Sequence, residues 1–129
     1  AAFLNVMLED FEKNQSRRKA IAKSYLEAFE NISELILPEG ILGEDHNAHL
    51  FVVQTKQRDE LKKFLAEKGI GTAIHYPTIL PDMKPYFSVG DFPNARNLAN
   101  QVLSLPLNPY LREEEVGEII KMVYSFFGA

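Results

Sequence analysis

Three histidines and one tyrosine are the side chains with the clearest chemical potential: His46, His49, His75 and Tyr76. Three imidazoles would suffice to hold a catalytic zinc ion. His46 and His49, however, lie only three residues apart across an expected loop-to-strand junction, and no helix carries a His-x-x-x-His pair. The spacing therefore predicts no metal site.

His49 opens an apolar stretch, residues 49–55, whose β-branched and aromatic residues favour a largely buried strand. A structural, hydrogen-bonded role and a role in a binding site both remain open for His49. We expect His46, which precedes it in a loop, to be solvated.

His75 ends a short apolar run that follows a helical pattern. Gly69 is the type of residue that closes a helix in the left-handed conformation, since it has no Cβ to clash. Residues 70–76 are bounded like a strand, and Pro77 cannot donate to a sheet ladder. The strand should stop near Tyr76, which leaves an imidazole and a phenol at its rim. By themselves these residues are compatible with a small-molecule site or with structural packing.

The chain does not contain a complete set of residues for other kinds of catalysis. Cysteine is absent, no serine lies in a nucleophile-elbow motif, and no glycine-rich phosphate loop precedes a helix. The lysines lie mainly on expected helices, where we expect them to be solvated charges. The chain by itself therefore lacks a complete catalytic apparatus.

The elements that must position these side chains follow from periodicity and turn residues. We expect helices over residues 2–31, 57–68, 92–101 and 113–127, and strands over 35–37, 49–55, 70–76 and 102–105. Residues 77–90, with three prolines and no clear period, should form a loop, and loops of this length are often functional. The result is an α+β fold, a small antiparallel or mixed sheet of three to four strands covered by helices.

Length, charge and cysteine content argue against some classes of function. The 129 residues fit one domain, and a net charge of -4 with scattered Lys and Arg argues against a nucleic-acid partner. No apolar run is long enough to span a membrane, and the absence of cysteine fits the cytoplasm.

The first residues begin in helical register without a preceding N-cap. We therefore expect the chain to be cut inside or just before a helix and to be a piece of a larger protein. Within the single domain 1–129, residues 1–31 would form a long connecting helix and residues 32–129 a small α/β domain.

An ordered series of short motifs resembles a known family. It comprises residues 49–53, 58–61, 69–70, 75–77, 92–95, 103–106 and 111–116, after an opening helix with Arg17, Arg18 and Tyr25. The series is similar to the C-terminal small domain of the DegT/DnrJ/EryC1/StrS family of PLP-dependent sugar aminotransferases, and it covers essentially the whole chain.

The resemblance implies the C-terminal domain of a fold-type I PLP enzyme. The parent would be a homodimer that moves an amino group from glutamate to a nucleotide-linked keto sugar, with PLP as electron sink. The cofactor lysine and phosphate cup would belong to a large domain absent here, so we expect this chain alone to bind no PLP and to be inactive. His75, Tyr76 and His49 are the implied substrate-binding residues.

The chain departs from the family pattern after Pro77. Pro81 stands where relatives often have a second histidine, and Met83 where they often have glutamine. Substrate identity is therefore open, although the segment 58–77 looks most like members that aminate C3 of dTDP-linked 3-keto-6-deoxy sugars. Two alternatives remain: a non-catalytic binding module of the same fold, and the small domain of a PLP-dependent sugar dehydratase that has histidine in place of the lysine.

Overall fold

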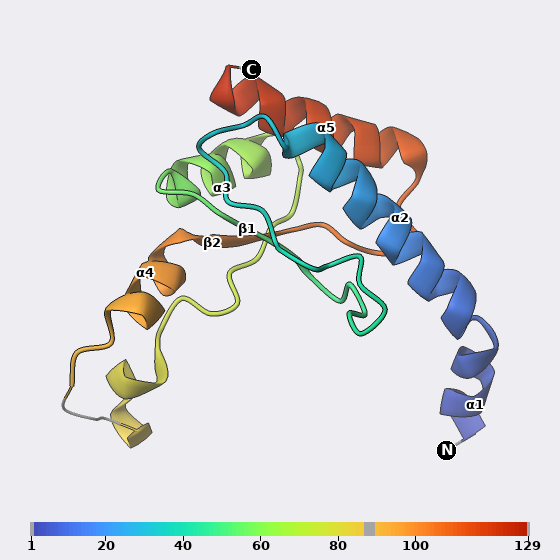
Figure 1. Ribbon diagram of the computed structural model, residues 1–129, viewed down its shortest axis with the longest axis horizontal. Coiled ribbons are helices and arrows are strands. Elements are labelled where there is room, and N and C mark those ends of the chain that lie inside the picture. Colours follow the sequence, from blue (N-terminus) through green and yellow to red (C-terminus); the bar gives the residue numbers. More distant parts are fainter. Residues whose placement is uncertain (1, 87–89, 129) are drawn as a thin grey trace.

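The computed structural model describes residues 2–86 and 90–128, which form helices around a small antiparallel sheet (Figure 1). In chain order the elements are α1 (Ala2–Glu9), α2 (Phe11–Phe29), β1 (Phe51–Gln54), α3 (Arg58–Glu67), the 3-10 turns η1 (Leu80–Asp82) and η2 (Lys84–Tyr86), α4 (Pro93–Gln101), β2 (Val102–Leu105) and α5 (Glu113–Phe127). Helices α2, α3 and α5 lie along one side of the strands, and α4 lies on the other (Figure 1).

The sheet is smaller than the sequence predicts. Strands β1 and β2 pair antiparallel, with Phe51 opposite Leu105 and Val53 opposite Leu103. The segments 35–37 and 70–76, expected to be strands, contribute one bridge each, Ile36 with Gln54 and Ala73 with Ser104. The described residues thus hold two regular strands flanked by single bridges, in place of three to four strands.

Proline explains part of this difference. In an antiparallel ladder, hydrogen-bonded pairs recur every second residue. Beyond the Ile36 bridge the next such position on that segment is Pro38, and beyond the Ala73 bridge the next position on β2 in one direction is Pro106. Neither proline has an N–H to donate, so both ladders stop.

The helices match their expected positions with two exceptions. The single helix predicted over residues 2–31 is two helices, because Asp10 leaves the helical conformation at φ -96° and ψ 2°, and aspartate is a poor helix former in a helix interior. Helix α4 begins at Pro93, with Phe92 as its N-cap, one residue later than expected. The predictions for α3 and α5 are confirmed within one residue at each end.

The core lies between the helices and the inward face of the strands. Tyr25, Phe29 and Phe51 are fully buried, and the Tyr25 ring meets Phe51 edge-on with 5.1 Å between the ring centroids. Leu103, Leu61 and other aliphatic side chains complete this layer. Aromatic side chains at the centre of the core therefore connect α2 to β1.

Helix α1 has no buried residue and extends away from the rest of the molecule (Figure 1). Its exposed apolar side chains, with the one that opens α2, are Phe3, Leu4, Val6, Met7, Leu8 and Phe11. An exposed apolar patch of this kind marks a surface that packs against something else. Among the described residues, no helix combines the length and apolar character needed to cross a bilayer.

The buried hydroxyl of Tyr25 predicts a loss of stability at alkaline pH. Burial raises the pKa of this hydroxyl, which donates to the carbonyl oxygen of Pro106 at 2.9 Å. An unfolded tyrosine loses its proton near pH 10, so above about pH 10 the unfolded state binds fewer protons and the free energy of unfolding falls. Urea unfolding between about pH 8 and 11 should show a steeper decline for the wild type than for Tyr25→Phe. Parallel declines for the two proteins would contradict this prediction.

Candidate functional site

The chain reaches the edge of the sheet through a left-handed glycine. Gly69 adopts a φ of 77° after α3, and the N–H of Ile70 donates back to the carbonyl of Leu65 at 2.9 Å. This is the Schellman pattern, which ends a helix and reverses the chain. The sequence prediction for Gly69 is confirmed. The reversal brings Ala73 against Ser104 of β2 and places His75 just beyond the bridge.

Ser104 holds the imidazole of His75. The ring Nδ1 lies 2.9 Å from the Ser104 hydroxyl, and Ser104 is only 4% exposed, whereas His75 is exposed. The hydroxyl can donate to Nδ1 or accept from it, and in either case the bond fixes the ring orientation. Nε2 has no hydrogen-bond partner among the residues that the structure describes. An oriented imidazole with one available nitrogen can bind a ligand hydroxyl or carbonyl, or move a proton to or from it.

A pocket of about 430 Å³ opens beside this histidine. Residues 75–81 form one wall and α4 the other, and the lining residues are His75, Tyr76, Thr78, Ile79, Leu80, Pro81, Phe92, Ala95, Leu98, Ala99 and Val102. The Tyr76 ring stands edge-on to the His75 ring at 5.6 Å and is 72% exposed. The structure thus brings His75 and Tyr76 together at the rim of an apolar pocket, a common arrangement for a ligand site.

An ion pair joins the two walls. The Arg96 guanidinium of α4 donates to both carboxylate oxygens of Asp82 in η1, at 2.6 and 2.9 Å. The hydrogen bond to Asp82 raises the pKa of Arg96 above its ordinary value. Bidentate Arg–carboxylate pairs have a defined geometry, so this pair fixes where residues 80–82 lie relative to α4.

The other two histidines lie elsewhere. His49 precedes β1, is exposed, and does not line the His75 pocket; its backbone N–H donates to the Asn47 side chain at 3.1 Å. His46 is also exposed, and its Nδ1 accepts from the Ala48 N–H at 2.9 Å. Across residues 2–86 and 90–128, no group of three or more His, Cys, Asp or Glu side chains is placed to hold a metal ion.

Sequence reasoning missed Ser104 as the partner of His75. The sequence did indicate that Ser104 needs a partner. It is the single polar residue in the otherwise apolar strand β2, and a buried hydroxyl requires a hydrogen-bond partner. Which residue supplies that partner could not be read from the sequence, since His75 is 29 positions away.

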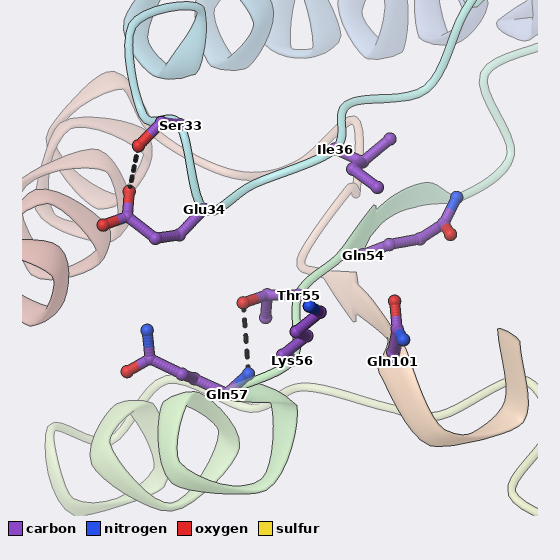
Figure 2. A pocket seen from close by; sticks show the side chains of 8 residues that line it. All are labelled: Ser33, Glu34, Ile36, Gln54, Thr55, Lys56, Gln57 and Gln101. Carbon is purple, nitrogen blue, oxygen red and sulfur yellow. Dashed lines mark hydrogen bonds between the residues drawn. The ribbon is translucent and has the colours of Figure 1, made fainter. Parts of the chain in front are cut away.

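A second pocket, of about 320 Å³, shares no lining residue with the first (Figure 2). All of its lining residues except Ile36 are polar types, and they comprise Ser33, Glu34, Ile36, Gln54, Thr55, Lys56, Gln57 and Gln101. Two of its hydroxyls already have partners, because Ser33 donates to Glu34 and Thr55 accepts from the Gln57 N–H. It holds no imidazole, so the pocket beside His75 is the stronger candidate.

The His75 pocket can bind and orient a ligand, but its lining residues do not fit a covalently held cofactor. No lysine lines it to form an imine, and no Lys or Arg is present among its lining residues to pair with a phosphate. Its polar groups are the His75 imidazole, the Tyr76 phenol and the Thr78 hydroxyl.

Comparison with known proteins gives a consistent set of relatives. The sequence profile of the DegT/DnrJ/EryC1/StrS aminotransferase family matches residues 1–124. A dTDP-3-amino-3,6-dideoxy-alpha-D-galactopyranose transaminase from Aneurinibacillus thermoaerophilus is 35% identical over 128 residues, covering 98% of this chain and 35% of that protein. The erythromycin biosynthesis sensory transduction protein EryC1 of Saccharopolyspora erythraea is 36% identical over 124 residues, covering 93% and 34%.

Solved structures agree with the sequence comparison. The crystal structure of S. venezuelae DesV in complex with a ketimine intermediate superimposes with a TM-score of 0.92 at 32% identity, covering 99% of this chain and 36% of that one. The chain spans about a third of the length of these relatives. The helices and antiparallel strands described above are therefore an arrangement also found in solved aminotransferase structures.

Proposed function

Because this chain belongs to the DegT/DnrJ/EryC1/StrS aminotransferase family, we propose that it is the C-terminal small domain of a PLP-dependent sugar aminotransferase. The complete enzyme transfers an amino group from glutamate to a nucleotide-linked keto sugar and acts as a cytoplasmic homodimer. The observation that carries the proposal is the match along nearly the whole chain to a transaminase named for a dTDP-linked amino sugar.

The exposed apolar surface of α1 supports the proposal that a large domain packs against it in the complete enzyme. Its exposed apolar side chains need a cover, and the relatives contain about twice as many further residues as this chain supplies. A domain packed on α1 would remove these side chains from water, which stabilises the assembly by roughly 25 cal/mol per Å² of apolar area. In this arrangement residues 1–31 join the two domains.

The cofactor belongs to that large domain in our proposal. No lysine lines the pocket beside His75 to form an imine, and we expect this chain alone to bind no PLP and to be inactive. One solved relative is described in a pyridoxamine phosphate form. The small domain contributes substrate contacts and one wall of the active site.

His75 and Tyr76 are the proposed substrate-binding residues of this wall. Ser104 holds the His75 ring, so that its Nε2 can bind an oxygen of the sugar. Tyr76 presents an exposed phenol beside it. His49 remains a prediction as a third contact. Pro81 lies in the pocket lining where relatives often carry histidine, so this enzyme recognises its sugar with fewer polar side chains on that wall.

Incubation of the complete enzyme with PLP and glutamate tests the proposal. We expect the absorbance of bound PLP to shift to that of the pyridoxamine form, and a nucleotide-linked 3-keto sugar to restore the original spectrum. The isolated 129-residue chain, treated identically, should show neither bound cofactor nor a spectral change. A complete protein that binds no PLP would overturn the proposed function.

A further inference from the structure

Helix α4 runs directly into strand β2 without an intervening loop. The helix ends at Gln101, and Val102 already has extended backbone angles, φ -74° and ψ 139°. The last carbonyls of a helix normally lack intrahelical partners, and a left-handed glycine often supplies the missing turn. No glycine stands here. Another group must therefore satisfy the carbonyls at this junction.

Arg58, the first residue of α3, is that group. Its Nη1 donates to the carbonyl oxygens of Ala99 at 3.0 Å and Val102 at 3.2 Å. The residue is 7% exposed. A buried guanidinium is tolerated when its N–H groups have partners, so the side chain is committed to this position. Arg58 thus connects α3 to the end of α4 and the start of β2.

Val102 is also the residue that His75 would meet if the edge ladder continued. Ala73 pairs with Ser104 through hydrogen bonds of 2.8 and 3.2 Å. Two residues further along each segment, the next pair would be His75 with Val102. Both backbone groups of Val102 are already engaged, because its N–H donates to Leu98 and its carbonyl accepts from Arg58. The pairing therefore ends at Ala73.

The ladder ends beside the His75 ring. His75 lies two residues past the last bridge and directs Nδ1 to the Ser104 hydroxyl, at the rim of the pocket of about 430 Å³. The two residues whose carbonyls bind Arg58, Ala99 and Val102, line the same pocket. One buried side chain thus holds two residues of the pocket lining and occupies the carbonyl that would accept from the His75 N–H in a longer ladder.

We propose that Arg58 is a positioning residue for His75 and for the pocket beside it. It acts through the carbonyls of Ala99 and Val102. The ion pair with Asp59 is secondary: the Asp59 carboxylate accepts from Arg58 Nε at 2.6 Å but is 79% exposed, and exposed ion pairs contribute little. The consequence for catalysis rests on the proposed function, whereas the effect on His75 does not.

Histidine NMR on the 129-residue chain tests the geometric part. His46 and His49 lie outside the pocket and serve as internal references for the imidazole Cε1–H signals. Arg58→Met removes every donor, and Arg58→Lys keeps the charge but loses the planar fork that serves both carbonyls. We expect the His75 signal to move in both variants, and further in Arg58→Met, while the two reference signals stay in place. Asp59→Asn, the matched control, should leave all three unchanged.

Two outcomes overturn the proposal: a folded Arg58→Lys variant with an unmoved His75 signal, or an Asp59→Asn variant that moves it as far as the Arg58 variants do. If Arg58→Met does not fold, the Arg58→Lys spectrum decides. A general loss of packing would shift all three histidines, so movement of the reference signals also counts against a specific role.

Kinetic measurements on the complete enzyme test whether Arg58 affects binding of the sugar substrate. Displacement of a substrate-contacting group by a distant substitution lowers productive binding, and we expect Arg58→Lys to raise KM for the sugar substrate by roughly tenfold. The glutamate half-reaction should keep its rate. If the complete protein proves not to be an aminotransferase, the NMR result still stands. If it is one and KM does not change, the role of Arg58 in substrate binding is refuted.

Discussion

Replacing His75 with alanine in the complete enzyme is expected to slow the sugar half-reaction by about 10- to 100-fold and to leave the glutamate half-reaction nearly unchanged. The reason is geometric. Ser104 fixes one nitrogen of the ring, and the other is available to a ligand at the pocket rim. Single-turnover absorbance measurements of each half-reaction separate the two effects.

Two variants serve as controls for this prediction. Ser104→Ala keeps the imidazole but removes its fixed partner, so it should give a smaller loss, also confined to the sugar half-reaction. Ser33→Ala removes a hydroxyl of the second pocket, which shares no lining residue with the first, and we expect it to have little effect. Equal losses in both half-reactions of His75→Ala would argue against a sugar-facing histidine.

Replacing Phe51 with alanine is expected to lower the free energy of unfolding by about 3–5 kcal/mol. Phe51 is fully buried, packs edge-on against Tyr25, and joins the strand layer to α2. The truncation leaves a cavity that the surrounding aromatic rings cannot fill without repacking. Urea unfolding of the 129-residue chain, followed by circular dichroism, measures the change.

Phe3→Ala is the matched control, since it deletes the same atoms from a side chain that is 89% exposed. We expect its effect to stay within about 0.5 kcal/mol. A similar loss in both variants would mean that α1 is covered in the isolated chain, for example by a second copy. That result would contradict the exposed position of α1.

Local patterns were sufficient to predict most helices. The apolar stripe of α5, with Val116, Ile119 and Val123 buried, follows the helical period, and its acidic first turn suits the positive end of a helix. Gly69 ends α3 as expected because the requirement for a positive φ is a property of one residue. Such features depend on neighbours within about one turn, so sequence alone shows them.

Strand extent was less predictable. Residues 70–76 have the composition of a strand, yet pairing there is a single bridge. The limit is set by the proline at position 106 on one side and by the occupied backbone groups of Val102 on the other. Propensity describes whether a segment suits a sheet, whereas its length in the sheet depends on donors and acceptors that distant residues leave free.

The sequence by itself determined the order of helices, the left-handed turn at Gly69, the placement of His75 and Tyr76 next to each other, and the resemblance to a family to which the chain belongs. Only the tertiary structure decided that Ser104 holds the His75 ring, that Arg96 joins Asp82, and that Arg58 reaches the end of α4. Each of these contacts joins residues between 14 and 41 positions apart. Periodicity and capping act over one or two helical turns, so they carry no information about hydrogen bonds formed between elements that folding brings together.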